Sequence, residues 1–143
     1  MDTVVVGVDN SDVSTRAVEF AVERAQKNDW KVVLVHVVPW SPYSFTTPSE
    51  NEHRHRERES EISAAQEQIL VPMAAIAEEA GVSHEALVKH GKPSDTMSDI
   101  ADEVGAVHLI VGRTGDGGLR EAVFGSVASR LVQQAKIPVT VVP

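Results

Sequence analysis

Short apolar runs alternate along the chain with segments in which apolar residues recur every three or four positions. The runs are rich in Val, Ile and Leu, which is typical of strands buried on both faces, and they cover residues 3–8, 32–38, 85–88, 107–111 and 139–142. The periodic segments predict amphipathic helices. The first follows a turn at residues 9–12 and ends near Asn28, and the others cover residues 62–80, 93–104 and 126–132. Strands that alternate with helices indicate an α/β domain with a mostly parallel, five-stranded sheet.

The segment 40–60 has the weakest pattern in the chain. It holds two prolines and the run HRHRERES without any periodic apolar signal, so we expect a surface loop. Ser49 and Glu52 have the spacing of a capping box, which could start a helix that continues into the apolar face of 62–80. Pro72 interrupts that face and predicts a kink or a restart, because proline has no N–H for the helical hydrogen bond.

Composition limits the class of protein. A length of 143 residues with 42% hydrophobic content predicts one domain over residues 1–143. The chain has no cysteine, so disulfides and thiolate chemistry are excluded. No apolar run is long enough to cross a bilayer and no signal-peptide pattern opens the chain, so we expect a cytoplasmic location. The net charge of −8 argues against binding to nucleic acids or anionic membranes, whereas a small nucleotide stays compatible with it.

The strongest candidate for chemistry is a glycine-rich connection between the strand at 107–111 and the helix that begins near Ser126. Its glycines are Gly112, Gly115, Gly117, Gly118 and Gly125. Backbone amides of such a loop can approach a ligand closely, and the N–H groups at the start of the helix can bind phosphate. Glycines that only shape turns are the alternative. Their number, together with the Gly-Ser helix start, favours the phosphate site.

The pattern Gly112-x2-Gly115-x9-Gly125-Ser126 resembles the nucleotide-binding signature of ATP-binding universal stress proteins. The opening VVVGVDNSDVSTRAVEFAVERA and the close IPVTVVP are similar to the first strand and helix and to the last strand of that family. The resemblance implies a three-layer sandwich with strand order 3-2-1-4-5. In that order the first and fourth strands are neighbours whose connections leave to opposite faces, so a crevice opens at their carboxyl ends.

The resemblance also implies a set of nucleotide contacts. Asp9, at the rim of the crevice, could accept hydrogen bonds from ribose or could cap a helix, and the resemblance implies the ribose role. Gly112 and Gly115 would lie close to ribose and phosphate, and Arg113 is a weaker candidate because loop arginines are usually solvated. The full set is Val8, Asp9, Val37 (through its backbone, to adenine), Gly112, Arg113, Gly115, Gly125, Ser126 and Val127.

Several enzyme classes lose support from the residues. The chain contains no P-loop motif, no dinucleotide fingerprint after its first strand and no nucleophile elbow. His36, His84, His90 and His108 stand singly in or beside strands, without the spacing of a metal site. His53 and His55 lie in a mixed-charge run that is typical of a solvated segment.

We therefore expect an ATP-binding regulatory or sensing module that acts with an unidentified protein partner, with Mg²⁺ or Mn²⁺ bridging the phosphates. Enzyme activity would be at most weak ATP hydrolysis. A slow ATPase that uses hydrolysis as a timer and an interaction protein with an empty pocket remain alternatives. The β-branched run Val139–Val142 carries no Lys, Glu or internal proline, and in the implied order it lies at the sheet edge. This predicts a homodimer joined through the last strand.

Overall fold

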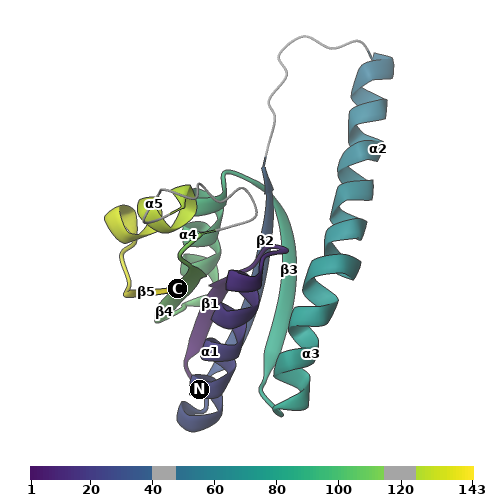
Figure 1. Ribbon diagram of the computed structural model, residues 1–143. Helices are drawn as coiled ribbons and strands as arrows, with labels where there is room; N and C mark the ends of the chain where they lie inside the picture. The colour runs from purple at the N-terminus through teal and green to yellow at the C-terminus, as the bar shows by residue number, and fades with distance from the viewer. Residues whose placement is uncertain (40–47, 115–124) are drawn as a thin grey trace.

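The computed structural model describes residues 1–39, 48–114 and 125–143 (Figure 1). Its elements follow in the order β1 (Thr3–Gly7), α1 (Asp12–Asn28), β2 (Lys31–Pro39), α2 (Pro48–Ala65), the π-helical turn η1 (Gln66–Leu70), α3 (Val71–Glu79), β3 (His84–Gly91), α4 (Pro93–Val104), β4 (His108–Gly112), α5 (Ser126–Gln134) and β5 (Val139–Val142). No helix within the described ranges has the length and apolar character that crossing a bilayer requires.

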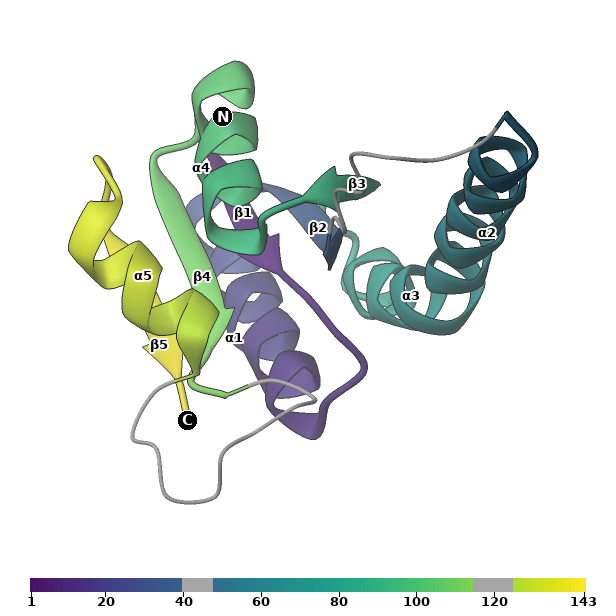
Figure 2. The same cartoon turned by 90° about the horizontal axis from the view of Figure 1, so that it is seen from above.

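The five strands form one parallel sheet in the order β3-β2-β1-β4-β5, with helices on both faces (Figure 2). Val4 and Val6 of β1 pack in the layer formed with α1 and α3, whereas Val5 packs in the layer formed with α4 and α5. All three valines are fully buried. Burial on both faces explains why the strands read as continuous apolar runs. The predicted α/β class, the three layers and the strand order 3-2-1-4-5 are confirmed.

The surface loop expected over 40–60 is wrong for its second half, because α2 is helical from residue 48 onward. Ser49 accordingly lies inside the helix and does not cap it. None of residues 49–64 is buried, and α2 extends beyond the sheet (Figure 1). Such a helix leaves no apolar stripe in the sequence. It is supported instead by pairs of side chains four residues apart, His53–Glu57 (2.8 Å) and His55–Glu59 (3.0 Å).

The expected interruption at Pro72 is confirmed. The π-helical turn η1 directly precedes α3, which has this proline in its first turn. Proline lacks the N–H of the helical bond, and its ring displaces the carbonyl four residues earlier, so the preceding turn widens. Leu70 and Met73, only 2% and 6% exposed, keep the chain packed on the sheet across this change.

The strands end at different heights at the carboxyl edge of the sheet. The β1–β2 ladder stops at the pair Gly7↔Val35, whereas the β2–β3 ladder continues to Pro39↔Gly91. Both β2 and β3 are therefore longer than the predicted apolar runs, and Pro39 is the last residue of β2. The end of β2 consequently extends past β1 and has a neighbour on one side only.

Candidate functional site

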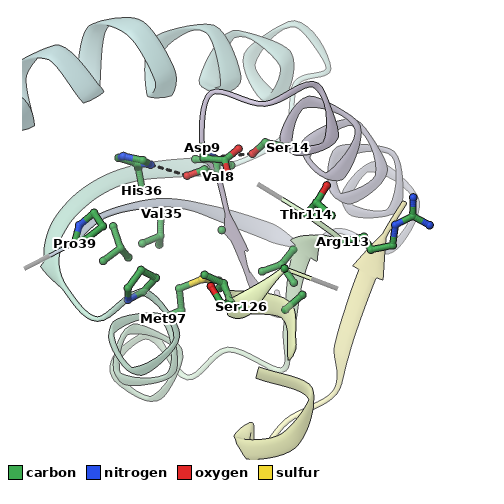
Figure 3. A pocket seen from close by; sticks show the side chains of 18 residues that line it. Val8, Asp9, Ser14, Val35, His36, Pro39, Met97, Arg113, Thr114 and Ser126 are labelled. Carbon is green, nitrogen blue, oxygen red and sulfur yellow. Dashed lines mark hydrogen bonds between the residues drawn. The ribbon is translucent and has the colours of Figure 1, made fainter. Parts of the chain in front are cut away.

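A cavity of about 410 Å³ opens where β1, β2 and β4 end, beside the first turns of α4 and α5 (Figure 3). Its volume lies in the range of small-molecule sites. It is lined by Gly7, Val8, Asp9, Ser14, Val35, His36, Val37, Pro39, Pro93, Met97, Val111, Gly112, Arg113, Thr114, Gly125, Ser126, Val127 and Ala128. The cavity therefore lies in the crevice that the strand order predicts.

Asp9 is held at the rim by the turn that starts α1. Ser11 is the N-cap, because its Oγ accepts the Ser14 N–H at 3.1 Å. Asp9 Oδ1 accepts both the Ser11 N–H, at 3.0 Å, and the Ser11 hydroxyl. The Asp9 N–H donates to Ser14 Oγ at 2.8 Å, and Ser14 is only 3% exposed (Figure 3). The cap of α1 is thus Ser11, and Asp9 is a preorganised carboxylate beside the cavity.

Val8 and His36 join the ends of β1 and β2. The Val8 N–H donates to the Val35 carbonyl at 2.8 Å. The Val8 carbonyl lies 2.7 Å from His36 Nδ1 (Figure 3). A carbonyl can only accept, so Nδ1 must carry the proton. This places the histidine ring, which sequence reasoning set aside, at the wall of the cavity.

The start of α5 presents backbone donors to the cavity. Gly125 is the N-cap in an extended conformation, and its N–H donates to the Arg113 carbonyl at 2.6 Å. The bond from the Ser129 N–H to the Gly125 carbonyl, at 3.0 Å, is the first of the helix. The N–H groups of Ser126 and Val127 precede it and have no acceptor within the helix. A helix start of this kind binds anions.

Gly112, the last residue of β4, and Arg113 directly after it line the cavity as well. A Cβ at Gly112 would lie 2.5 Å from Val13 Cγ1, so this glycine lets α1 approach the end of the strand. Arg113 is exposed, and its side chain points away from the other lining residues (Figure 3). Its N–H donates to the Val142 carbonyl at 2.7 Å. Arg113 therefore contributes to the wall mainly through its backbone.

The remaining wall is apolar and comes from residues that sequence reasoning assigned to the core or passed over. Met97 and Pro93 belong to the first turns of α4, and Val35 and Pro39 belong to β2. The Pro-Ser start of a helix directly after a strand could have indicated these residues, because such starts meet at the carboxyl edge of a parallel sheet.

Eight of the nine residues expected at the site line this cavity: Val8, Asp9, Val37, Gly112, Arg113, Gly125, Ser126 and Val127. Gly115 lies outside the described residues. Sequence reasoning missed the lining side chains of Ser14, His36, Pro93, Met97 and Thr114. Within the described ranges, no group of three or more His, Asp or Glu side chains could hold a metal ion.

The family model described as the universal stress protein family matches residues 1–143. A universal stress protein of Methanocaldococcus jannaschii is 32% identical over 139 residues, which are 97% of this chain and 80% of that protein. The chain spans 47% of the length of the mycobacterial universal stress proteins that it matches.

Two solved structures extend the comparison to ligands. A universal stress protein from Archaeoglobus fulgidus in complex with dAMP has a TM-score of 0.71 and 27% identity, with 100% of this chain and 98% of that chain covered. A universal stress protein in complex with cAMP has a TM-score of 0.71 and 28% identity, with 99% of this chain and 97% of that chain covered.

Proposed function

The chain belongs to the universal stress protein family, and on that premise we propose that it binds an adenine nucleotide in this cavity and acts as a nucleotide-dependent regulatory module. One observation carries the proposal: the donor-rich start of α5 and the one-sided end of β2 open onto the same cavity. The first suits phosphate and the second suits a base. Relatives with 27% and 28% identity in complex with dAMP and cAMP support the same ligand class.

Each part of a nucleotide has a matching region in the cavity. The backbone of Val37 and the apolar wall around Met97 would take the base. The carboxylate of Asp9 would accept hydrogen bonds from ribose hydroxyls, as charged acceptors do strongly. The N–H groups of Ser126 and Val127 would bind phosphate, beside Gly112 and Gly125. We propose ATP as the ligand because β1 separates β2 from β4, the strand that precedes α5, so a chain of phosphates would span from a base beside β2 to the start of α5.

A divalent ion, Mg²⁺ or Mn²⁺, would be held through the phosphates. Asp9 is the sole carboxylate among the described lining residues, and its Oδ1 already accepts two hydrogen bonds from Ser11. Mg²⁺ commonly keeps several waters and binds through substrate phosphates, which suits a site with so few protein ligands. The ion would neutralise phosphate charge next to a chain with a net charge of −8.

We propose binding and signalling in preference to rapid turnover. Asp9 and His36 are the titratable lining groups able to accept a proton in the described part of the chain, and each makes hydrogen bonds that maintain the local fold. A homodimer through β5 completes the proposal. This strand lies at the edge of the sheet, and Val139, Thr140 and Val141 are only half-buried there. An exposed edge of this composition can pair with its own copy.

Heating the purified protein in acid and separating any released nucleotide by chromatography tests the proposal, together with thermal melting in ATP and Mg²⁺. A ligand at a hundredfold excess over its Kd stabilises the folded state by about 2.7 kcal/mol, which raises Tm by several degrees.

Ser126→Pro is the variant that tests the phosphate contact in the melting experiment. It removes one phosphate-facing N–H at the first helical position, where proline is well tolerated, so it should lose the ATP-induced shift and keep the ligand-free Tm. An unchanged Tm for the wild type at millimolar ATP would leave the empty-pocket alternative.

A further inference from the structure

The ladder between β1 and β2 advances every second residue along both strands, as in any parallel pair. At its start the Lys31 N–H donates to the Asp2 carbonyl at 2.8 Å. Repeated along both strands, the same stagger brings the Val37 N–H opposite the Val8 carbonyl. A regular ladder would therefore end with a hydrogen bond between these two groups.

That hydrogen bond is not formed. The register stops at Gly7↔Val35, and the bond from the Val8 N–H to the Val35 carbonyl is the last of the ladder. The Val8 carbonyl is instead 2.7 Å from His36 Nδ1, the protonated nitrogen of the ring (Figure 3). Within the described ranges no other group bonds the Val37 N–H, although Val37 lines the cavity.

The Val37 amide is thereby left as a donor beside an apolar wall. The Val37 carbonyl points the same way as the Val37 N–H, because in a parallel sheet both backbone groups of one residue face the same neighbouring strand. A buried amide without a partner costs free energy, so such a site favours a ligand that supplies the missing acceptor. A ring nitrogen beside an exocyclic amino group, the pattern of adenine, supplies an acceptor for the N–H and a donor for the carbonyl.

We propose that His36 is a positioning residue for the base: its Nδ1–H engages the Val8 carbonyl and so keeps the Val37 N–H available to the nucleotide. The inference rests on the proposed function for the identity of the ligand. Its structural half is that His36 prevents the hydrogen bond from the Val37 N–H to the Val8 carbonyl, and this part does not depend on any ligand. In this role His36 does not bind the base itself. It acts indirectly, because its hydrogen bond to the Val8 carbonyl leaves the Val37 N–H available.

Amide hydrogen exchange in the nucleotide-free protein tests the structural half. Val35 is the matched control, because its N–H belongs to the ladder on the same strand two residues earlier. The Val37 amide should exchange much faster than the Val35 amide, and nitrogen chemical shifts of His36 should report the Nδ1–H tautomer. Protection of Val37 equal to that of Val35 would overturn the inference.

Two substitutions at the same position separate the hydrogen bond from mere packing. His36→Leu removes the donor, so the Val37 N–H should close onto the Val8 carbonyl and become protected, and ATP affinity should fall about tenfold, the value of one hydrogen bond. His36→Asn places an amide N–H near the position of Nδ1 and should retain both the exposed Val37 amide and the affinity. Because His36→Leu exchanges one hydrogen bond for another, its Tm should stay close to that of the wild type.

The outcomes distinguish this inference from the proposed function. If the wild type binds no adenine nucleotide, the proposed function fails and the exchange rates in His36→Leu and His36→Asn alone decide the role of the histidine. If the wild type binds ATP and His36→Leu binds it equally well, the positioning role is overturned while the proposed function stands. A loss of affinity in His36→Asn as large as in His36→Leu would also overturn it.

Discussion

The side chain of Met97 lies against the backbone of Gly7, so that a Cβ at position 7 would be 2.5 Å from Met97 Cε and 2.6 Å from Sδ. Gly7 ends β1 and Met97 comes from α4, and both line the cavity. Any side chain at position 7 would therefore displace the thioether of Met97. The terminal atoms of a methionine side chain can move, and the open space next to them is the cavity itself.

Gly7→Ala should push Met97 into the space that the base would occupy. We expect a loss of about 1 kcal/mol in unfolding free energy, at the low end for overpacking, measured by urea denaturation. ATP affinity should fall about tenfold or more. Adding Met97→Ala should restore most of the affinity, because the two residues are in contact and their effects are coupled. Strictly additive effects in the double variant would contradict this account of Gly7.

Asp9→Asn separates the two roles open to Asp9. Asparagine keeps an oxygen that can accept the Ser11 N–H, so the turn before α1 and the stability should be preserved. The charge is lost, and hydrogen bonds to a charged acceptor contribute about 1.5–3 kcal/mol, so calorimetry should show ATP affinity lower by about tenfold or more. If Asp9→Asn binds ATP like the wild type while Asp9→Ala is unstable, the residue serves the turn alone.

Stability should decrease as the pH falls below about 6.5, in part because of His108. Burial lowers the pKa of this histidine, and its Nε2 lies 2.6 Å from Thr140 Oγ1. The unfolded chain then takes up a proton at a pH where the folded chain does not, so protons favour unfolding between the two pKa values. Above that window the contribution is complete. Urea denaturation between pH 7.5 and 5.5 should show that the unfolding free energy of His108→Gln depends less steeply on pH than that of the wild type. An unchanged slope would exclude His108 as a cause of the pH dependence.

The predicted homodimer depends on β5. Val141→Lys places a charge on the half-buried edge strand and should shift sedimentation equilibrium from dimer to monomer at micromolar concentration. Val71→Lys is the matched control, because Val71 is 62% exposed on α3, which packs on β2 and β3 at the other end of the sheet from β5. A wild type that sediments as a monomer would refute the dimer, and dissociation of both variants alike would assign the interface elsewhere.

The fold was largely predictable because burial leaves a pattern in the sequence. The five strands read as apolar runs since helices cover both faces, but neighbour relations leave no such pattern, and the strand order came from the family resemblance. The start of α2 was missed for the same physical reason: a helix whose turns are exposed all round, as around His53 and Glu57, has no apolar period to detect.

The candidate site was predictable where backbone groups would bind the ligand. It was not predictable where a side chain acts on the backbone. Glycines and the Gly-Ser start of α5 are visible in the sequence. The role of His36 is not, because it depends on the stagger between β1 and β2, which spacing along one strand does not contain. The sequence left Asp9 as either a ribose contact or the cap of α1. The structure assigns the cap to Ser11, which a run of four capping residues does not reveal.

We propose that the cavity between β1, β2 and β4 binds an adenine nucleotide. Isothermal titration of the nucleotide-free wild-type protein with ATP and Mg²⁺ tests it most directly, with GTP as the control for the base. We expect saturable binding of one ATP per chain with a Kd well below 1 mM, equivalent to more than about 4 kcal/mol, and clearly weaker binding of GTP. No measurable binding of ATP at millimolar concentration, or equal affinity for GTP, would contradict it.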